Sequence, residues 1–138
     1  MISLRIRAAF AAAALSVLAV PAPAQAHRGP VSPVSATSAA ALSLAVRDDG
    51  TGAVSQVELL CHPTGGTHPQ AAAACAALDA AGGAPDRLTP VTGVFCYQLY
   101  QPVTASVTGS WLGKPVRWEQ TFGNGCELHT RTGPVFRF

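Results

Sequence analysis

Alternating apolar and polar positions predict a β-hairpin over residues 41–61. Residues 41–47 alternate large apolar side chains with small or polar ones, and a similar alternation resumes over residues 54–61. Successive side chains of a strand point to opposite faces, so this pattern is typical of strands with one buried face. The acidic and glycine-rich residues 48–52 between the two runs favour a turn. We therefore expect the two runs to pair as antiparallel strands.

Further segments alternate in the same way toward the C-terminus. Residues 104–109 and 114–122 predict a second hairpin, with residues 110–113 as its turn. Residues 135–138 also alternate and predict a final strand. Together with the first hairpin, these segments indicate an antiparallel sheet of about five strands.

An alanine-rich segment predicts a helix over residues 71–81. Alanine has the highest helix propensity, and Gly82 and Gly83 follow as a stop signal. Thr67 is placed to cap the start of this helix. A second, short helix is expected over residues 127–130. The sequence therefore predicts an α+β fold, in which a five-stranded antiparallel sheet packs with one or two helices.

The first residues have the features of a secretory signal peptide. Arg5 and Arg7 give a basic start, residues 8–20 are almost entirely apolar, and residues 24–26 fit the small-x-small cleavage pattern. The apolar stretch is too short to span a membrane, which takes about 20 residues. We expect residues 1–26 to be removed and the mature protein to be secreted to the extracellular space.

The remaining chain is expected to comprise an arm and one domain. Residues 27–40 are rich in proline, serine, threonine and alanine, which favours a flexible arm. Residues 41–138 then have a common size for a single domain. Loss of residues 1–26 would leave seven basic and seven acidic residues, so no basic surface for nucleic acid or an anionic membrane is indicated.

The four cysteines of the mature part are Cys61, Cys75, Cys96 and Cys126. An even number in a secreted chain is typical of disulfides. Three pairings are possible, and we favour the sequential one, in which Cys61 bonds Cys75 and Cys96 bonds Cys126. On the chain-entropy estimate, the shorter loop would stabilise the fold by about 3 kcal/mol and the longer one by slightly more.

Residue types that could carry catalysis or bind a metal do not form a recognisable pattern. The chain has no Gly-x-Ser-x-Gly motif and no acidic pair in a catalytic setting, so no enzymatic activity is expected. His129 stands alone and is expected to be solvated. The only zinc-type group is Cys61, His62, His68 and Cys75. Its spacing matches no zinc motif and secretion favours thiol oxidation, so we prefer a disulfide beside two loop histidines and expect no metal or cofactor.

The most unusual stretch is residues 94–103, where aromatic and aliphatic side chains crowd around Cys96. A protease binds its substrate as an extended strand, with side chains in pockets on either side of the cut bond. An inhibitor that presents such a strand rigidly loses little entropy on binding, and a disulfide within the loop would supply that rigidity. A strand buried in the core is the alternative, and composition alone favours neither.

Several motifs in order carry a resemblance to a known family. The first two cysteines flank a Gly-Thr-His-Pro element at residues 66–69, and a Gly-Gly pair ends the alanine-rich segment. The run Val-Phe-Cys-Tyr-Gln-Leu-Tyr-Gln-Pro-Val at residues 94–103 is followed by Trp-Leu-Gly-Lys at 111–114 and by Cys126-Glu127. Across residues 42–138 the chain resembles the Streptomyces subtilisin inhibitor family.

The resemblance implies a function and an assembly. The chain would be a secreted, substrate-mimicking inhibitor of an extracellular subtilisin-like serine protease. It would carry the sequential disulfides, a five-stranded antiparallel sheet with two helices, and a homodimer interface on the sheet.

The resemblance also implies roles for individual residues. Gln98-Leu99 would be the bond offered to the protease, with Gln98 in the primary specificity pocket. Asn124 would brace the loop through its side-chain amide. The other residues contacting the protease would be Phe95, Cys96, Tyr97 and Tyr100.

Two residues of this segment refine the expectation. Tyr97 stands where the family usually has proline, which pre-sets the backbone. The alternative function is therefore a secreted binding or structural domain of the same fold without inhibitory activity. Gln98 is uncharged and would leave the buried carboxylate of a trypsin-like pocket unpaired, so we expect subtilisin-like targets.

Overall fold

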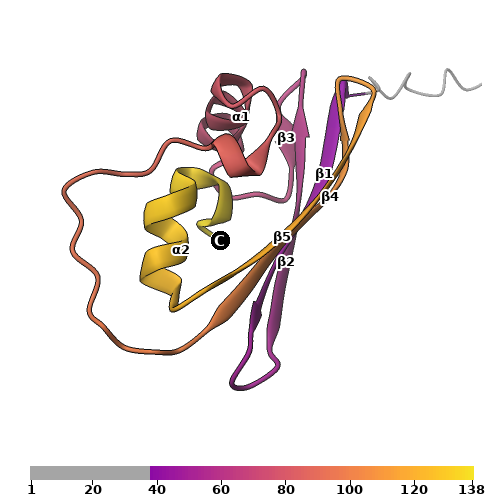
Figure 1. The fold of residues 1–138 in the computed structure, drawn as a ribbon. Helices are drawn as coiled ribbons and strands as arrows, with labels where there is room; N and C mark the ends of the chain where they lie inside the picture. Colours follow the sequence, from indigo (N-terminus) through magenta and orange to yellow (C-terminus); the bar gives the residue numbers. More distant parts are fainter. Residues whose placement is uncertain (1–37) are drawn as a thin grey trace, which may run out of the picture. The chain divides into compact units, whose positions relative to one another are not determined.

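A five-stranded antiparallel sheet organises residues 38–138, the part of the chain that the computed structural model describes (Figure 1). The expected signal peptide at 1–26 and residues 27–37 of the expected arm lie outside the described residues. The strand order is β3-β2-β1-β4-β5. The strands are β1 (Ala40–Asp48), β2 (Val54–Cys61), β3 (Gly65–Gly66), β4 (Val103–Trp111) and β5 (Lys114–Phe122). The helices are α1 (Ala71–Ala80) and α2 (Gly125–Thr132), with 3-10 turns η1 (Pro85–Arg87) and η2 (Gly133–Phe136).

Both predicted hairpins are confirmed. In the first, β1 pairs antiparallel with β2, so that Leu42 lies opposite Leu59. In the second, β4 and β5 pair antiparallel along their whole length, which leaves only Leu112 and Gly113 in the turn. Both turn residues have positive φ, at 48° and 78°. The turn is thus two residues long rather than the four expected, and positive φ at both positions is what such tight hairpin turns require.

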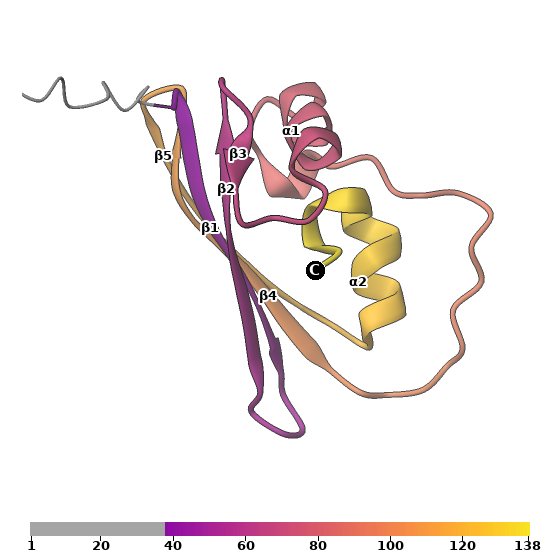
Figure 2. The same cartoon turned by 180° about the vertical axis from the view of Figure 1, so that it is seen from behind.

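The core lies on one face of the sheet, because the strands alternate and both helices pack on the same side (Figures 1 and 2). Fully buried side chains of the sheet include Leu44, Leu59 and Val107. From the helical layer, Leu78 of α1 and Leu128 of α2 are equally buried. The opposite face of the sheet carries small and polar side chains, among them Ser43, Ala45, Ser106 and Thr108.

The predicted C-terminal strand is wrong. Residues 133–136 form η2, a 3-10 turn that begins at Gly133 with φ 58°. Val135 and Phe136 are adjacent and both fully buried. A strand would send one of them to the opposite face, so the turn is what lets both reach the core.

The fifth strand is instead β3, in a segment where no strand was predicted. Gly65 and Gly66 pair with the end of β2, opposite Leu60 and Leu59. A Cβ at Gly66 would lie 2.3 Å from the carbonyl oxygen of Glu58. Only glycine allows the two backbones to approach this closely, which explains a strand without β-forming side chains.

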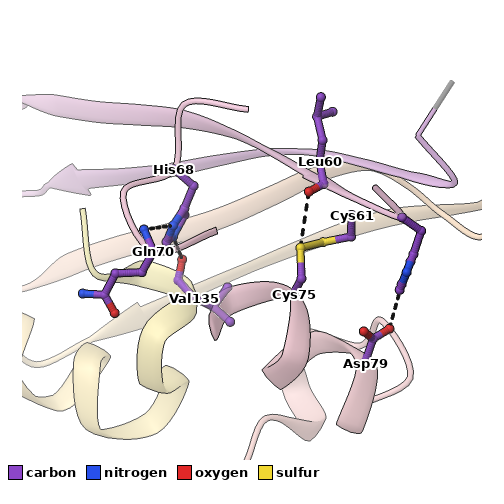
Figure 3. The surroundings of a disulfide bond; sticks show 8 residues. Leu60, Cys61, His68, Gln70, Cys75, Asp79 and Val135 are labelled. Carbon is purple, nitrogen blue, oxygen red and sulfur yellow. Dashed lines mark hydrogen bonds and ion pairs between the residues drawn. A yellow bond between two sulfur atoms is a disulfide. The ribbon is translucent and has the colours of Figure 1, made fainter. Parts of the chain in front are cut away.

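The start of α1 also differs from the prediction. Thr67 does not cap the helix, since its hydroxyl accepts a hydrogen bond from the Glu58 backbone N–H at 2.9 Å. The N-cap position is Gln70, whose backbone N–H donates to Nδ1 of buried His68 at 3.0 Å. His68 Nε2 therefore carries the proton and donates to the carbonyl oxygen of Val135 at 2.9 Å (Figure 3). This histidine ties the entry to α1 to the C-terminal segment.

The sequential disulfide pairing is confirmed. Cys61 at the end of β2 bonds Cys75 on α1, with both residues buried (Figure 3). Beside it, His62 and Asp79 of α1 pair at 2.9 Å. The second disulfide joins Cys96 to Cys126. Among residues 38–138, no helix combines the length and the apolar character needed to cross a membrane.

Candidate functional site

A long segment that projects from the body of the fold is the exposed loop, which we define as residues 91–102. It connects the η1 region to β4 without regular secondary structure and swings away from α2 (Figures 1 and 2). Its middle is open to solvent, Gln98 included. The exposed fractions are 96% for Phe95, 91% for Tyr97, 80% for Tyr100 and 58% for Leu99. The alternative of a buried strand is therefore wrong.

A disulfide fixes the middle of the exposed loop to α2. Cys96 bonds Cys126, which lies in the first turn of the helix, with a Cα–Cα distance of 5.7 Å. The hydroxyl of Thr130, one turn further along α2, lies 3.5 Å from the Cys96 sulfur. Cys126 is exposed and Cys96 half-buried, so this bridge is more accessible to solvent than the first one.

Asn124 braces the exposed loop from the N-terminus of α2. Its side-chain Nδ2 donates to the carbonyl oxygen of Leu99 at 2.9 Å and to that of Tyr97 at 3.4 Å. Its Oδ1 accepts from the backbone N–H of Glu127 at 2.9 Å and so caps the helix. The two loop carbonyls belong to peptides on either side of the Gln98-Leu99 bond. One side chain therefore contacts both sides of that bond.

Backbone hydrogen bonds hold the ends of the exposed loop. On one side, the Val91 N–H donates to the carbonyl oxygen of Thr130 at 2.8 Å. On the other side, the Gln101 N–H donates to the carbonyl oxygen of Gly123 at 2.9 Å. All the anchors apart from Cys96 thus use backbone atoms of the loop.

The β1–β2 turn supports the last residue of the exposed loop. The Asp49 N–H donates to the carbonyl oxygen of Pro102 at 3.0 Å. The neighbouring Asp48 is the acceptor that orders this turn, and hydrogen bonds from the Thr51 backbone and hydroxyl lower the pKa of its carboxyl. A turn far away in the sequence therefore helps to fix where β4 begins.

Between its anchors the exposed loop does not pack on the helix. A hollow of about 540 Å³ separates the loop from α2 and from the turn before it. The floor of the hollow includes Glu127, Thr130 and Arg131. The conformation of the loop therefore depends on its anchors and not on packed side chains beneath it.

The other candidate residues of the sequence do not form a site. His62 pairs with Asp79 and His68 with Val135, while the two cysteines near them are bonded to each other. Within residues 38–138, no three ligand-type side chains gather as a metal site would require.

His129 was expected to be solvated, but it is partly buried. Burial first, and then the positive charge of Arg137, lower the pKa of its ring, while a backbone hydrogen bond with Phe136 opposes them.

Sequence reasoning missed several residues that position the loop, above all Glu127. Its carboxylate Oε2 accepts from the Gly123 N–H at 2.9 Å, immediately before the capping residue Asn124. A signal was present, because an asparagine followed three residues later by glutamate is a sequence pattern of helix starts. The contribution of Asp49 had no such signal, since it comes from another hairpin.

Comparison with known proteins links this geometry to characterised molecules. The family model described as "Subtilisin inhibitor-like" matches residues 36–124. Subtilisin inhibitor-like protein 5 of Streptomyces fradiae is 47% identical over 83 residues, which cover 59% of this chain and 78% of that protein. Subtilisin inhibitor-like protein 4 of Streptomyces lavendulae is 40% identical over 111 residues, which cover 77% of this chain and 96% of that protein.

Two further comparisons were with a trypsin inhibitor and with an inhibitor–protease complex. The trypsin inhibitor of Streptomyces longisporus is 47% identical over 83 residues, or 59% of this chain and 58% of that protein. Among solved structures, Streptomyces caespitosus sermetstatin, crystallised in complex with Bacillus licheniformis subtilisin, matches with a TM-score of 0.62 and 32% identity. The match covers 72% of this chain and 98% of that one.

Proposed function

The chain belongs to the subtilisin inhibitor-like family, and we propose that it blocks subtilisin-like serine proteases by filling their active sites with the exposed loop. It acts as a protease inhibitor and not as an enzyme. The observation that carries the proposal is the contrast within residues 91–102. The side chains in the middle of this segment are exposed, while its backbone is anchored on both sides of the Gln98-Leu99 bond.

Gln98-Leu99 is the bond offered to the protease in this proposal. A protease binds an extended strand and inserts side chains on both sides of the cut bond into pockets. Gln98 enters the primary pocket, and Leu99 lies just beyond the bond. Phe95, whose ring is almost fully exposed, suits an apolar pocket of the protease. Cys96, Tyr97 and Tyr100 complete the contact surface.

Rigid anchoring explains why such a loop inhibits instead of being digested. A loop that is already in the bound conformation loses little entropy when it binds, which raises affinity. If the protease cuts the bond, Cys96 and the Tyr97 carbonyl keep the acyl side in place. Asn124 holds the Leu99 carbonyl on the amine side. The two ends therefore stay close enough to rejoin.

The side chain of Gln98 favours subtilisin-like over trypsin-like targets. A trypsin-like pocket contains a buried carboxylate that requires lysine or arginine, and an uncharged side chain leaves it unpaired. A subtilisin-type pocket is wide and tolerates a long polar side chain. The relatives of this chain include proteins named as subtilisin inhibitors and one named as a trypsin inhibitor, so the proposed preference needs to be tested against both proteases.

Secretion and a homodimer are part of the proposal. The signal-peptide pattern at residues 1–26 supports an extracellular site of action. The face of the sheet opposite the helices is polar and carries small side chains at Ser43, Ala45 and Ser106. Such side chains allow a second sheet to approach closely, so this face is the proposed dimer interface. Sedimentation of the parent protein and of Ala45→Arg tests it, because a long charged side chain there should give monomers.

Titration of subtilisin activity with the purified protein tests the proposed function. We expect activity to fall linearly and to end at a one-to-one ratio of chains, with Gln98-Leu99 as the only bond cut on long incubation. Trypsin, titrated in parallel, should be inhibited far more weakly. Rapid digestion without inhibition would instead favour the alternative function, a secreted binding or structural domain of the same fold.

A further inference from the structure

We propose that Glu127 is a positioning residue of the exposed loop. It holds in place the turn at Gly123 and Asn124, and this turn contacts both sides of the Gln98-Leu99 bond. This inference rests on the proposed function, since it assumes that the loop binds a protease. The contacts that support it lie within the described residues. Glu127 lies on α2, in the first turn of the helix, and does not belong to the exposed loop.

The carboxylate of Glu127 acts on the amine side of the bond through Gly123. Oε2 accepts a hydrogen bond from the Gly123 N–H at 2.9 Å. The carbonyl oxygen of the same glycine accepts from the Gln101 N–H at 2.9 Å. The N–H of Gly123 is therefore bound by Glu127, while the carbonyl oxygen of Gly123 binds the exposed loop at Gln101.

The backbone of Glu127 acts through Asn124 on both sides of the bond. Its N–H donates to Oδ1 of Asn124 at 2.9 Å. An amide whose oxygen is engaged in this way must turn its nitrogen outward. That nitrogen is the donor to the carbonyl oxygens of Leu99 and Tyr97. The hydrogen bond from the Glu127 N–H thus fixes the side-chain orientation in which Asn124 contacts the loop.

Two further observations show that the Glu127 side chain is closely fitted to the turn and lies beneath the loop. A Cβ at Gly123 would lie 3.1 Å from Oε2 of Glu127, so the turn and the carboxylate are closely fitted. Glu127 also lies on the floor of the hollow beneath the loop, on the side of α2 that faces the loop. A hydrogen bond to a charged acceptor is stronger than a neutral one, so the carboxylate suits this task.

The test compares Glu127→Ala and Glu127→Gln with the parent protein, and uses Asp86→Asn as the matched control. Asp86 is an exposed acid on η1, so its substitution removes the same charge away from the loop. Three quantities are measured: the inhibition constant for subtilisin, the rate at which bound subtilisin cuts Gln98-Leu99, and the backbone ¹⁵N heteronuclear NOE of residues 97–101. Thermal unfolding of each variant is recorded beside them.

We expect Glu127→Ala to raise both the inhibition constant and the cleavage rate about tenfold, as loss of a charge-assisted hydrogen bond predicts, and to lower the loop NOE values. Glu127→Gln keeps an acceptor oxygen and should recover most of the parent behaviour. Asp86→Asn should match the parent throughout.

A Glu127→Ala variant that unfolds at lower temperature, but keeps the parent's inhibition constant and NOE values, would show a merely structural residue and overturn the inference. If the parent itself fails to inhibit, the proposed function fails. The NOE comparison then still decides whether Glu127 orders the loop.

Discussion

The backbone N–H of Asp49 donates a hydrogen bond to the carbonyl oxygen of Pro102 at 3.0 Å, which joins the β1–β2 turn to the end of the exposed loop. Both carboxylate oxygens of Asp49 are engaged as well. The hydroxyl of Thr104 donates to one at 2.8 Å, and Nε of Arg47 donates to the other at 2.9 Å. The loop therefore depends on contacts from the first hairpin as well as from α2.

Replacing Gln98 by lysine should create a trypsin inhibitor. A lysine in the primary position would pair with the buried carboxylate of a trypsin-like pocket, and an effect of a few kcal/mol corresponds to about a 100-fold lower inhibition constant. Inhibition of trypsin is measured for Gln98→Lys and for Gln101→Lys, which adds the same charge three residues later. If only the second variant gained trypsin inhibition, Gln98 would not be the primary residue.

The two roles of Asn124 can be separated by substitution. Asn124→Asp keeps an oxygen that caps α2 but loses the donor to Leu99 and Tyr97, whereas Asn124→Ala loses both. We expect Asn124→Asp to unfold near the parent temperature and yet to be cut by subtilisin about tenfold faster, since each lost hydrogen bond is worth about 1 kcal/mol. Mass spectrometry of the timed complex measures the cut. Equal cleavage of parent and Asn124→Asp would argue that the brace is dispensable.

The two disulfides should differ in their sensitivity to reductant. Cys61 and Cys75 are buried, whereas Cys126 is exposed, so a thiol reaches the loop bridge first. Mild reduction followed by alkylation should label Cys96 and Cys126 selectively. The labelled protein should retain its fold by circular dichroism but become a substrate that subtilisin degrades. Preferential labelling of the buried pair would contradict this order.

Gly83 should be hard to replace because of a neighbouring ring. A Cβ at Gly83 would lie 2.3 Å from the buried Trp111 ring, whereas one at Gly82 would meet nothing within 4 Å. Both glycines have positive φ, so both alanine variants are strained by about 1 kcal/mol. Gly83→Ala should lose about 1–3 kcal/mol more because the ring must move. Urea unfolding of the two variants measures the difference, and equal losses would show that the ring moves freely.

His129 should make the fold less stable as the pH falls. Burial and the charge of Arg137 lower the pKa of His129 below 6.5, so the unfolded chain takes up the proton more readily than the folded chain. The stabilising contribution is complete above about pH 6.5 and is lost as the pH falls toward the lower, folded pKa. His129→Gln removes this contribution. Urea unfolding at pH 7.5 and 5 should show a smaller pH effect in the variant, and an unchanged effect would exclude His129.

The sequence predicted most of the sheet because its strands follow simple alternation. Leu42 and Leu44 in β1 are buried while Ser43 between them faces the other side, so the period of two is visible without structural data. Alternation misled at the C-terminus, where Val135 and Phe136 are both buried within η2. The preceding Gly133 and Pro134 were the local signals of a turn, and the apolar pattern obscured them.

Two supports of the exposed loop were predicted, Asn124 and the Cys96–Cys126 disulfide, whereas its other supports were not. The crowding of apolar side chains around Cys96 singled out the segment but did not decide between an exposed loop and a buried strand. The family resemblance favoured the exposed loop and singled out Asn124. The contributions of Asp49 and Thr130 depend on how distant segments meet, which no local pattern encodes. Glu127 was within reach of sequence reasoning, but only if the asparagine had first been assigned to a helix start.

Apart from the Cys96 disulfide, the exposed loop is held through its main chain, and its exposed side chains take no part in the anchors. Residues such as Phe95, Tyr97 and Gln98 can therefore be substituted without changing the hydrogen bonds and the disulfide that hold the loop. Recognition and architecture are encoded at separate positions. The fold should accordingly serve as a template on which libraries of loop variants are selected against other proteases.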